Sequence, residues 1–307
     1  MEKWRKRALL YKVVSMLPWA DYLMDMVRSR LGGLKNFNVG HREYAIAEMI
    51  HLLRQAGKRV GGRCLAEIGS GWHPVLPMVF YALGARRVIM TDVHSHMRRV
   101  YVEQTLQHLL RRAEDVSKHV NRPASKLRES WNRLRPNNSA WAETWRERGI
   151  DYRAPFDFRR TGWPDGSVDM IFSNSCLGYI PTGHLRMIFA ESARVLRRGG
   201  WIAHNISVDD DYSGTDGSIN PLNFLRYSAD EWARIGNSRL HYQNRRRPGY
   251  YIQLAGESGL QVVCAERLRL TIRQDMLDRA ILDPEFRDLS EDELLCSHLL
   301  LVAEKRR

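Results

Sequence analysis

The chain has 307 residues, of which 44% are hydrophobic, and it carries a formal net charge of +13. That length buries a core easily, and the composition is ordinary for a globular protein. No apolar stretch approaches the roughly 20 residues that a membrane span needs, and the basic first residues are not followed by the cleavage site of a secretory signal. The composition therefore excludes a helical membrane span and argues against secretion.

The cysteines argue for a reducing compartment. They are far apart and never form a Cys-x-x-Cys pair, and three of them fall inside predicted strands or helices. This placement favours buried thiols over disulfides or a zinc site, and we expect a cytoplasmic protein. The four are Cys64, Cys176, Cys264 and Cys296.

The positive charge is concentrated in two segments. Residues 1–35 carry eight Lys or Arg against three acidic residues, and residues 98–160 carry fifteen against eight. In residues 271–307 the balance reverses, at six against nine. A basic face can recruit nucleic acid, anionic lipid head groups or a phosphorylated small substrate, and a solvated arginine-rich surface explains the same counts.

Residues 1–60 predict a helical arm. A first helix, residues 3–17, begins with basic residues and has one broad apolar face, and further helices are expected at 21–31 and 41–56. Such an arm can lie on a membrane surface through residues 1–17. The alternative is that it packs on the following domain as a lid over a ligand site.

An alternation of strands and helices follows, which is typical of a doubly wound α/β sheet. The second of two inserts, residues 208–250, starts where the fifth strand ends and is polar, aromatic and arginine-rich. We interpret it as a cap that binds the substrate, because ligands bind beyond the carboxyl ends of such strands. The first insert, residues 93–149, has helical apolar spacing. The expected strands are 64–68, 87–91, 150–153, 168–173, 201–207, 261–266 and 299–304, and helices are expected near 74–83 and 185–196.

The stretch LAEIGSGWHP, residues 65–74, is the most specific signal. A buried strand containing Glu67 leads into a Gly-Ser-Gly turn whose backbone can lie against a ligand. Twenty-one residues past Gly71, a second apolar run ends in Asp92, which is placed to accept hydrogen bonds from ribose hydroxyls. Pro74 replaces the third glycine of a dinucleotide site, and Glu67 would repel a phosphate but attract an ammonium or sulfonium. The loop therefore predicts S-adenosylmethionine as the cofactor rather than NAD.

These motifs resemble the first two motifs of class I S-adenosylmethionine-dependent methyltransferases. The resemblance extends over residues 60–207, and the fuller form Gly-Ser-Gly-Trp-His-Pro is similar to a bacterial subgroup with a Gly-Ser/Thr-Gly-Trp-x-Pro first motif. It implies a seven-stranded Rossmann-like sheet within residues 61–307, with the last strand antiparallel between the fifth and the sixth. The downstream matches are APFDF at 154–158, WPDGSVD at 163–169, MIFSN at 170–174 and VLRRGGW at 195–201.

The resemblance also implies how the cofactor is held. The two turn glycines admit the methionyl part, Glu67 organises the loop and Asp92 holds the ribose hydroxyls. Asp157 accepts from the adenine amino group with Phe158 beside the ring, unless Asp157 is a simple turn residue. Asn174 lies where related enzymes line the methyl-transfer site. The predicted cofactor-binding residues are Glu67, Gly69, Ser70, Gly71, Asp92, Asp157, Phe158 and Asn174.

Residues that act on the methyl acceptor are expected beyond the fifth strand. His241 is our candidate catalytic base, because a histidine with a pKa of about 6.5 can take a proton at neutral pH. His204, mid-strand, is expected to be structural. The run 209–211 could bind a divalent metal, but a solvated acidic loop explains it equally well and we predict no metal site. The predicted substrate-binding residues are Tyr179, Tyr212, Arg226, Tyr227, Asn244 and Arg245.

We expect methyl transfer to a small-molecule acceptor. The arginines of the second insert suit an acceptor with negative charge, and the methyl group is expected on its oxygen or, alternatively, on a nitrogen. One alternative is an RNA-modifying methyltransferase that uses the basic segment 98–160. Against it, an Asn-Pro-Pro-Tyr type motif is missing, and Cys176 lacks the preceding proline expected of a cysteine that attacks a pyrimidine. A non-catalytic cofactor-binding scaffold is the third hypothesis, but a scaffold needs no polar acceptor pocket.

Overall fold

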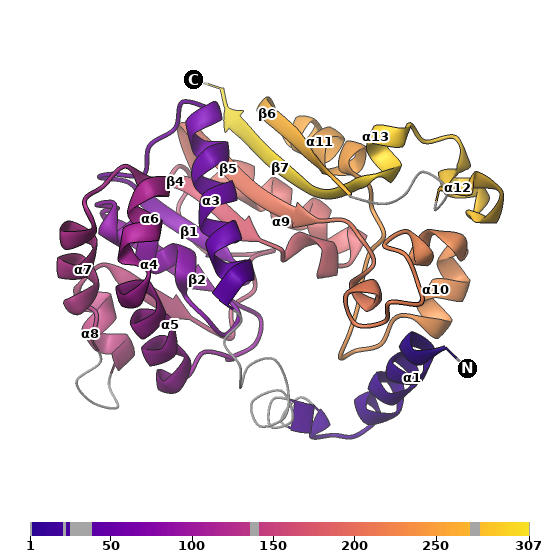
Figure 1. Ribbon diagram of the computed structural model, residues 1–307. Coiled ribbons are helices and arrows are strands. Elements are labelled where there is room, and N and C mark those ends of the chain that lie inside the picture. Colours follow the sequence, from indigo (N-terminus) through magenta and orange to yellow (C-terminus); the bar gives the residue numbers. More distant parts are fainter. Residues whose placement is uncertain (1, 21–22, 25–38, 136–140, 271–276, 307) are drawn as a thin grey trace.

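The computed structural model describes residues 2–20, 23–24, 39–135, 141–270 and 277–306, and a seven-stranded sheet lies at its centre (Figure 1). The strands are β1 Cys64–Ile68, β2 Arg87–Thr91, β3 Ile150–Arg153, β4 Val168–Asn174, β5 Leu196–Ser207, β6 Leu260–Arg269 and β7 Cys296–Lys305. Their order is β3-β2-β1-β4-β5-β7-β6.

The direction of the strands agrees with the predicted fold class. The neighbours from β3 to β5 are parallel, whereas β7 runs antiparallel to both β5 and β6. This confirms a doubly wound Rossmann-like sheet whose last strand lies between the fifth and the sixth. The strands β6 and β7 are longer than predicted because they pair with each other along their whole length. The pairing runs from Leu260 opposite Lys305 to Arg269 opposite Cys296.

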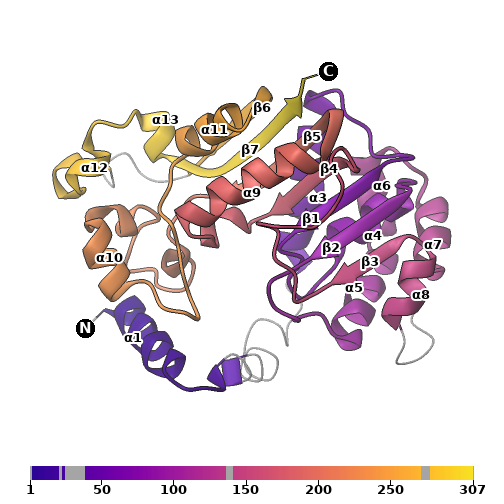
Figure 2. The ribbon, with the colours of Figure 1, turned by 180° about the vertical axis from the view of Figure 1, so that it is seen from behind.

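Helices cover both faces of the sheet, so its central strands are buried on both sides (Figures 1 and 2). Strand β1 is buried along its whole length, and its successive side chains enter opposite cores, Leu65 in one and Ala66 in the other. Helices α9 (Thr182–Val195) and α11 (Pro248–Glu257) contribute to the core with Ala66. The other core is formed with α3 (Val39–Gln55), α4 (Val75–Ala82), α5 (Arg99–Arg111), α6 (Ala113–Val120), α7 (Ala124–Asn132) and α8 (Trp141–Glu147).

The first insert forms part of this helical layer, as its apolar spacing predicts. Helices α5 to α8 lie between β2 and β3. Two tryptophans anchor the layer, because the indole of Trp131 donates to the carbonyl of Met78 at 3.0 Å and that of Trp145 donates to the carbonyl of Leu134 at 2.9 Å. Both rings are fully buried.

The second insert forms a lobe beside the sheet and has its own apolar cluster. This cap contains α10 (Ala229–Ile235), and residues from α12 (Pro284–Arg287) and α13 (Glu291–Leu294) add to its cluster. Ser290 caps the start of α13, since its side chain accepts from the backbone N–H of Glu293. None of the described helices is long and apolar enough to cross a membrane.

The predicted arm over residues 1–60 is divided between the two lobes. Helix α1 (Lys3–Ser15) packs on the cap, where the fully buried ring of Trp4 lies 5.6 Å from that of Tyr212 and 5.9 Å from that of Trp232. Helix α3 instead packs on the sheet. The arm therefore contributes one helix to the cap and one to the sheet domain, and its role as a lid stays a prediction. The helix predicted at 21–31 lies outside the described residues, except for residues 23–24.

We expect Trp4→Ala to lower the free energy of unfolding by about 3–5 kcal/mol, because it leaves a cavity among the aromatic rings of the cap. Trp19→Ala is the matched control, since Trp19 is 57% exposed and its loss should change stability by no more than about 0.5 kcal/mol. Urea denaturation followed by circular dichroism measures both. Equal losses in the two variants would contradict the packing of α1 on the cap.

Candidate active site

The Gly-Ser-Gly turn joins the carboxyl ends of two adjacent parallel strands. The backbone N–H groups of Gly69 and Ser70 both donate to the carbonyl of Thr91, at 2.9 and 3.0 Å. Gly69 has φ +74°, a left-handed conformation that favours glycine. A Cβ atom at this position would also overlap Sγ of Cys176, so the turn needs glycine for two independent reasons.

Asp92 connects this turn to the loop after β2. Its Oδ2 accepts from the backbone N–H of Gly71 at 2.9 Å, and its Oδ1 accepts from that of His94 at 2.9 Å. An ionised carboxylate offers about four acceptor positions, so capacity remains for hydroxyl donors. Asp92 lines two neighbouring cavities, which suits its predicted role as the ribose ligand.

The first cavity, of about 770 Å³, contains acceptor atoms that the protein leaves unsatisfied. Glu67 Oε2, Asn174 Oδ1 and Asn205 Oδ1 are buried, and none has a hydrogen-bond partner among the described residues. They come from the three neighbouring strands β1, β4 and β5, with Asn174 and Asn205 paired in register. Burying acceptors without partners is costly, so this arrangement fits a ligand that carries several N–H donors.

The charge state of Glu67 depends on what fills this cavity. Burial raises its pKa to about 8, and the negative charge of Asp92 adds to the shift, although a hydrogen bond from Ser70 opposes it. A positively charged amino group beside Glu67 would favour the carboxylate form. The cavity therefore suits the ammonium of an amino acid.

The second cavity, of about 1010 Å³, extends from the turn to the cap and contains the predicted adenine residues. Phe158 lines it and is packed against Phe156 and Trp163. Asp157 lines it too, but its carboxylate accepts from the backbone and the guanidinium of Arg159, which lowers its pKa. Asp157 therefore makes the contacts of a turn residue, which was the alternative to adenine binding. It nevertheless lines the cavity.

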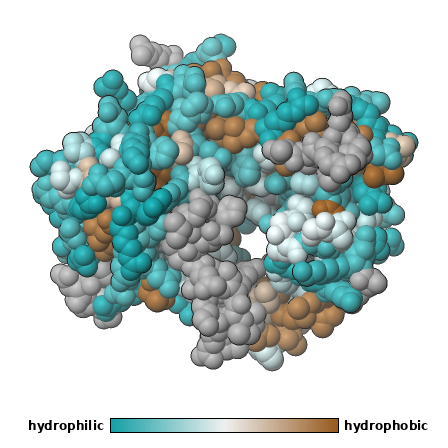
Figure 3. Space-filling model, viewed as in Figure 1, coloured by the Kyte–Doolittle hydropathy of each residue, from teal (hydrophilic) through white to brown (hydrophobic). Residues whose placement is uncertain are grey.

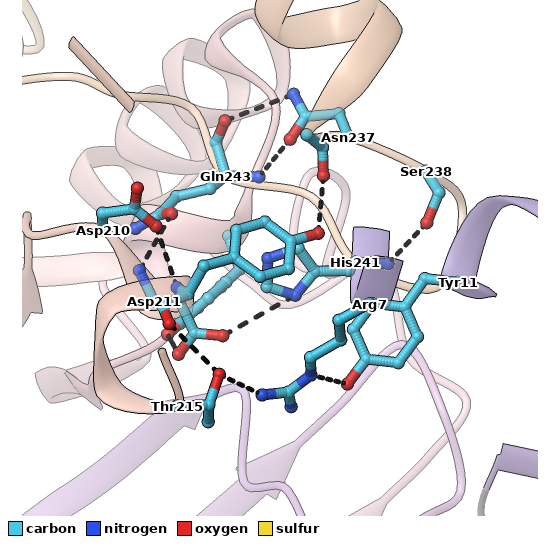
Figure 4. Close-up of polar contacts among 12 residues, drawn as sticks. Arg7, Tyr11, Asp210, Asp211, Thr215, Asn237, Ser238, His241 and Gln243 are labelled. Atoms are coloured by element: carbon cyan, nitrogen blue, oxygen red, sulfur yellow. Dashed lines mark hydrogen bonds and ion pairs between the residues drawn. The ribbon is translucent and has the colours of Figure 1, made fainter. Parts of the chain in front are cut away.

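His241 lies on the wall of this cavity that the cap provides (Figure 4). Its Nδ1 is 3.7 Å from Oδ2 of Asp211, whose Oδ1 accepts from the hydroxyl of Tyr179 at 3.1 Å. All three residues line the cavity. A carboxylate beside a histidine can orient the imidazole and stabilise its protonated form, so the group has the parts of a general base.

Helix α1 supports this histidine from outside the cap (Figure 4). The ring of Tyr11 stacks on His241 with centroids 5.6 Å apart. Arg7 holds that ring, because Nε donates to the Tyr11 hydroxyl at 2.9 Å and Nη1 donates to Oγ1 of Thr215 at 2.5 Å. No local pattern indicates this contact, since the two rings are separated by more than two hundred residues.

Of the six predicted substrate-binding residues, Tyr179 lines both cavities, whereas the other five line neither. Tyr212 is buried and donates to the carbonyl of Gly236. Asn244 donates to two backbone carbonyls. Their polar groups serve the structure of the cap. The remaining three are Arg226, which is exposed, Tyr227, which accepts from Arg5, and Arg245, which is buried and donates to carbonyls.

Several lining residues were missed by the sequence reasoning. Trp72 and His96 stack with centroids 4.2 Å apart and both line the first cavity. Ser175 has φ +51°, a strained conformation that is common at functional sites, and it separates Asn174 from Cys176. The aromatic residue next to the turn was the one available signal. The other lining residues that were missed include Tyr44, Glu48 and His298.

The acidic run 209–211 is largely bound by the protein's own donors. Asp210 accepts from the backbone N–H of Tyr212 and from the side chain of Asn223, and burial raises its pKa to about 7. Asp209 accepts from Ser207 at 2.7 Å. Within the described ranges, no group of three or more His, Cys, Asp or Glu side chains could hold a metal ion.

His204 has the structural environment that its mid-strand position predicts. It is buried, its Nδ1 lies 2.9 Å from Oγ of Ser173 on the neighbouring strand, and burial lowers its pKa to about 3. A histidine that stays neutral at physiological pH inside the sheet is a packing residue.

Comparisons with known proteins agree with this fold. Residues 138–204 match the family described as a methyltransferase domain. The methyltransferase in a complex with the Trm112 methyltransferase activator of Haloferax volcanii is similar at a TM-score of 0.50 and 15% identity, covering 92% of this chain and 96% of that chain. The domain match confirms the predicted enzyme class, for which S-adenosylmethionine is the cofactor, and the solved structure shares the predicted fold.

Two further solved structures are similar at TM-scores of 0.45. One is an S-adenosylmethionine-dependent methyltransferase from Mesorhizobium loti, with 15% identity over 82% of this chain and 95% of that chain. The other is geranyl diphosphate C-methyltransferase from Streptomyces coelicolor, with 15% identity over 84% of this chain and 80% of that chain. No curated protein matches the chain. The resemblance to a particular bacterial subgroup stays a prediction.

We expect Gly69→Ala to destabilise the protein by about 2 kcal/mol more than Gly71→Ala, because it adds an overlap with Cys176 to the cost of a left-handed alanine. Gly71 is the matched control, with φ +59° and no atom within 4 Å of a Cβ built there. Thermal or urea unfolding measures the difference. In the background of Cys176→Gly, which removes the overlap, the two alanine variants should become similar, and a persistent gap would contradict the steric explanation.

Proposed function

We propose that this enzyme transfers the methyl group of S-adenosylmethionine to an oxygen of a small-molecule acceptor bound between the sheet and the cap. The observation that carries the proposal is the cluster of three unsatisfied acceptors, on Glu67, Asn174 and Asn205, next to the glycine turn. These three acceptors suit the ammonium group of the methionyl part of the cofactor. A dinucleotide has no such ammonium group.

In this proposal, residues that line the second cavity would hold the rest of the cofactor. Asp92 lines both cavities and is positioned for the ribose hydroxyls, and Phe158 with Asp157 is positioned for the adenine. The two cavities also share Gly69, Cys176 and Tyr179. A cofactor held by these residues would have its methyl group near Tyr179, on the side that faces the cap.

The chain's own residues would position the acceptor and take its proton. S-adenosylmethionine, when bound, supplies a methyl group that an acceptor oxygen attacks as the bond from sulfur to that methyl group breaks. Holding the two reactants in line can contribute about 7–11 kcal/mol to lowering the barrier. His241 is placed to accept the hydroxyl proton of the acceptor, with Asp211 stabilising the protonated ring.

Two arginines of the second cavity support an acceptor with an anionic group, beside the carboxylates of Asp92, Asp157 and Asp211 that line the same cavity. Arg159, His184 and Arg239 line it together with His241. Arginine binds carboxylate or phosphate groups well because its planar guanidinium offers paired donors. Nitrogen methylation remains the alternative, because the same base would serve an amine acceptor.

The basic segment 98–160 gives less support to an RNA substrate. Many of its cations already form ion pairs on the helical layer, which reduces the charge available to phosphates. Burial also raises the pKa of the Cys176 thiol to about 12, so it is a poor nucleophile for attack on a pyrimidine. The paired cations are Arg99, Arg112, Lys118, Lys126, Arg128, Arg133 and Arg146.

We expect binding of S-adenosylmethionine at pH 7 to release about one proton, because Glu67 is protonated in the empty site and ionises beside the ligand's ammonium. Calorimetry in buffers of different ionisation enthalpy measures this release. Glu67→Gln should abolish it and weaken binding about tenfold or more. Glu266→Gln, on the exposed part of β6, is the control and should leave both unchanged. Tight binding of NAD with no binding of S-adenosylmethionine would contradict the proposed function.

We expect His241→Ala to lower turnover by about 10²-fold or more, with the affinity for S-adenosylmethionine little changed, if the imidazole is the base. The measurement is formation of S-adenosylhomocysteine with hydroxyl- and carboxyl-bearing acceptors, with mass spectrometry to locate the new methyl group. His119→Ala, on the exposed surface of α6, is the matched control. Turnover that survives in His241→Ala would exclude this histidine as the base, and a methyl group found on nitrogen would favour the alternative acceptor.

A further inference from the structure

Helix α1 has a second apolar face that points away from the cap. Trp4, Ala8 and Tyr11 are buried, at the spacing of one helix face. Large apolar side chains follow the opposite face and remain exposed. These are Leu9 at 52%, Leu10 at 57%, Val13 at 54% and Met16 at 76%, with Trp19 at 57% just beyond the helix.

The clustering of these side chains sets them apart from the other exposed apolar residues. Figure 3 shows the patch as a brown area over α1, at the lower right of the molecule. Single exposed apolar residues are normal, but contiguous patches mark contact surfaces. The other exposed large hydrophobics are separated from this helix in sequence, at Tyr44, Val93, Val100, Met187, Val263 and Ile281.

Positive charges flank this face. Residues 2–20 contain five cations and one acidic residue, Glu2. With 3.6 residues per turn, Lys3 and Arg7 fall on one side of the exposed stripe and Arg5 and Lys12 on the other. Lys6 lies on the exposed face itself, in the first turns of the helix. An apolar stripe bordered by lysine and arginine is the arrangement that binds an anionic lipid surface.

We propose that the outward face of α1, together with Trp19, docks this protein on the surface of an anionic lipid bilayer. The aliphatic side chains would enter the boundary between head groups and acyl chains, while the exposed Lys3 and Lys6 contact the phosphates. The net charge of +13 adds attraction to such a surface. Charge complementarity favours a bilayer over a second copy of this equally basic chain.

The docking helix is also connected to the candidate active site. Arg239 donates to the backbone carbonyls of Ser15 and Leu17, at 3.4 Å each, and it lines the second cavity. Tyr11, on the buried side of α1, stacks on His241 of the same cavity wall. A bilayer in contact with α1 would therefore lie beside the cap that forms this wall.

Sedimentation of the full chain with lipid vesicles tests the proposal. We expect binding to phosphatidylcholine vesicles that contain phosphatidylglycerol, much weaker binding to pure phosphatidylcholine, and a loss of binding as salt rises. The double variant Leu10→Asp/Val13→Asp should reduce partitioning about tenfold or more, and so should Lys3→Glu/Lys6→Glu. Val263→Asp/Ile281→Asp is the matched control, since it changes two exposed apolar residues elsewhere and should bind as the unaltered chain does.

Thermal unfolding and S-adenosylmethionine binding should be the same in all variants, which separates lost docking from lost folding. The proposal is overturned if the unaltered chain does not bind the anionic vesicles, or if Leu10→Asp/Val13→Asp binds them equally well. It is also overturned if the chain forms a dimer without lipid that this variant abolishes, because the face would then join two copies. None of these results depends on methyl transfer, so the proposed function is tested separately.

Discussion

Asp92 accepts hydrogen bonds from the turn after β1 and from the loop after β2, and the rest of the candidate site depends on that arrangement. Because the carbonyl of Thr91 also accepts from two N–H groups of the turn, the ends of both strands are held together at one edge of the sheet. At this edge, one cavity is lined by Glu67, Asn174 and Asn205. Each has a buried acceptor atom without a hydrogen-bond partner among the described residues. The close packing of the surrounding sheet keeps these three acceptors in fixed positions.

The cap imposes a different constraint, since its parts come from distant stretches of the chain. His241 is placed by Asp211 within the insert and by Tyr11 from α1, so three separate segments define one cavity wall. This wall faces a cavity whose other side belongs to the sheet. Under the proposed function, the cap would select the acceptor and the sheet would hold the cofactor, so the two could vary independently in such a fold.

Much of the sheet could be predicted from the sequence because its determinants are local. The strands β1, β2 and β3 have the predicted bounds, and the turn at Gly69 is specified by glycines next to a buried strand. The cap residues could not be assigned, because polar and aromatic composition does not distinguish a side chain that lines a cavity from one that binds a carbonyl. Asn244 and Arg245 illustrate this, since both donate to backbone carbonyls that only the folded cap brings near. The unsatisfied acceptor of Asn205 was missed for the same reason.

The packing of α1 also has a consequence for synthesis of the chain. The backbone N–H of Trp4 donates to Asp216, a partner 212 residues later in the sequence. At translation rates of about 5–20 residues per second, that partner is made roughly 10–40 s after the helix. During this interval both apolar faces of α1 are without the cap, so the nascent helix has the composition of a segment that chaperones or a lipid surface would bind first. Once the cap is complete, it competes with those partners for the face that contains Trp4. The opposite apolar face stays exposed.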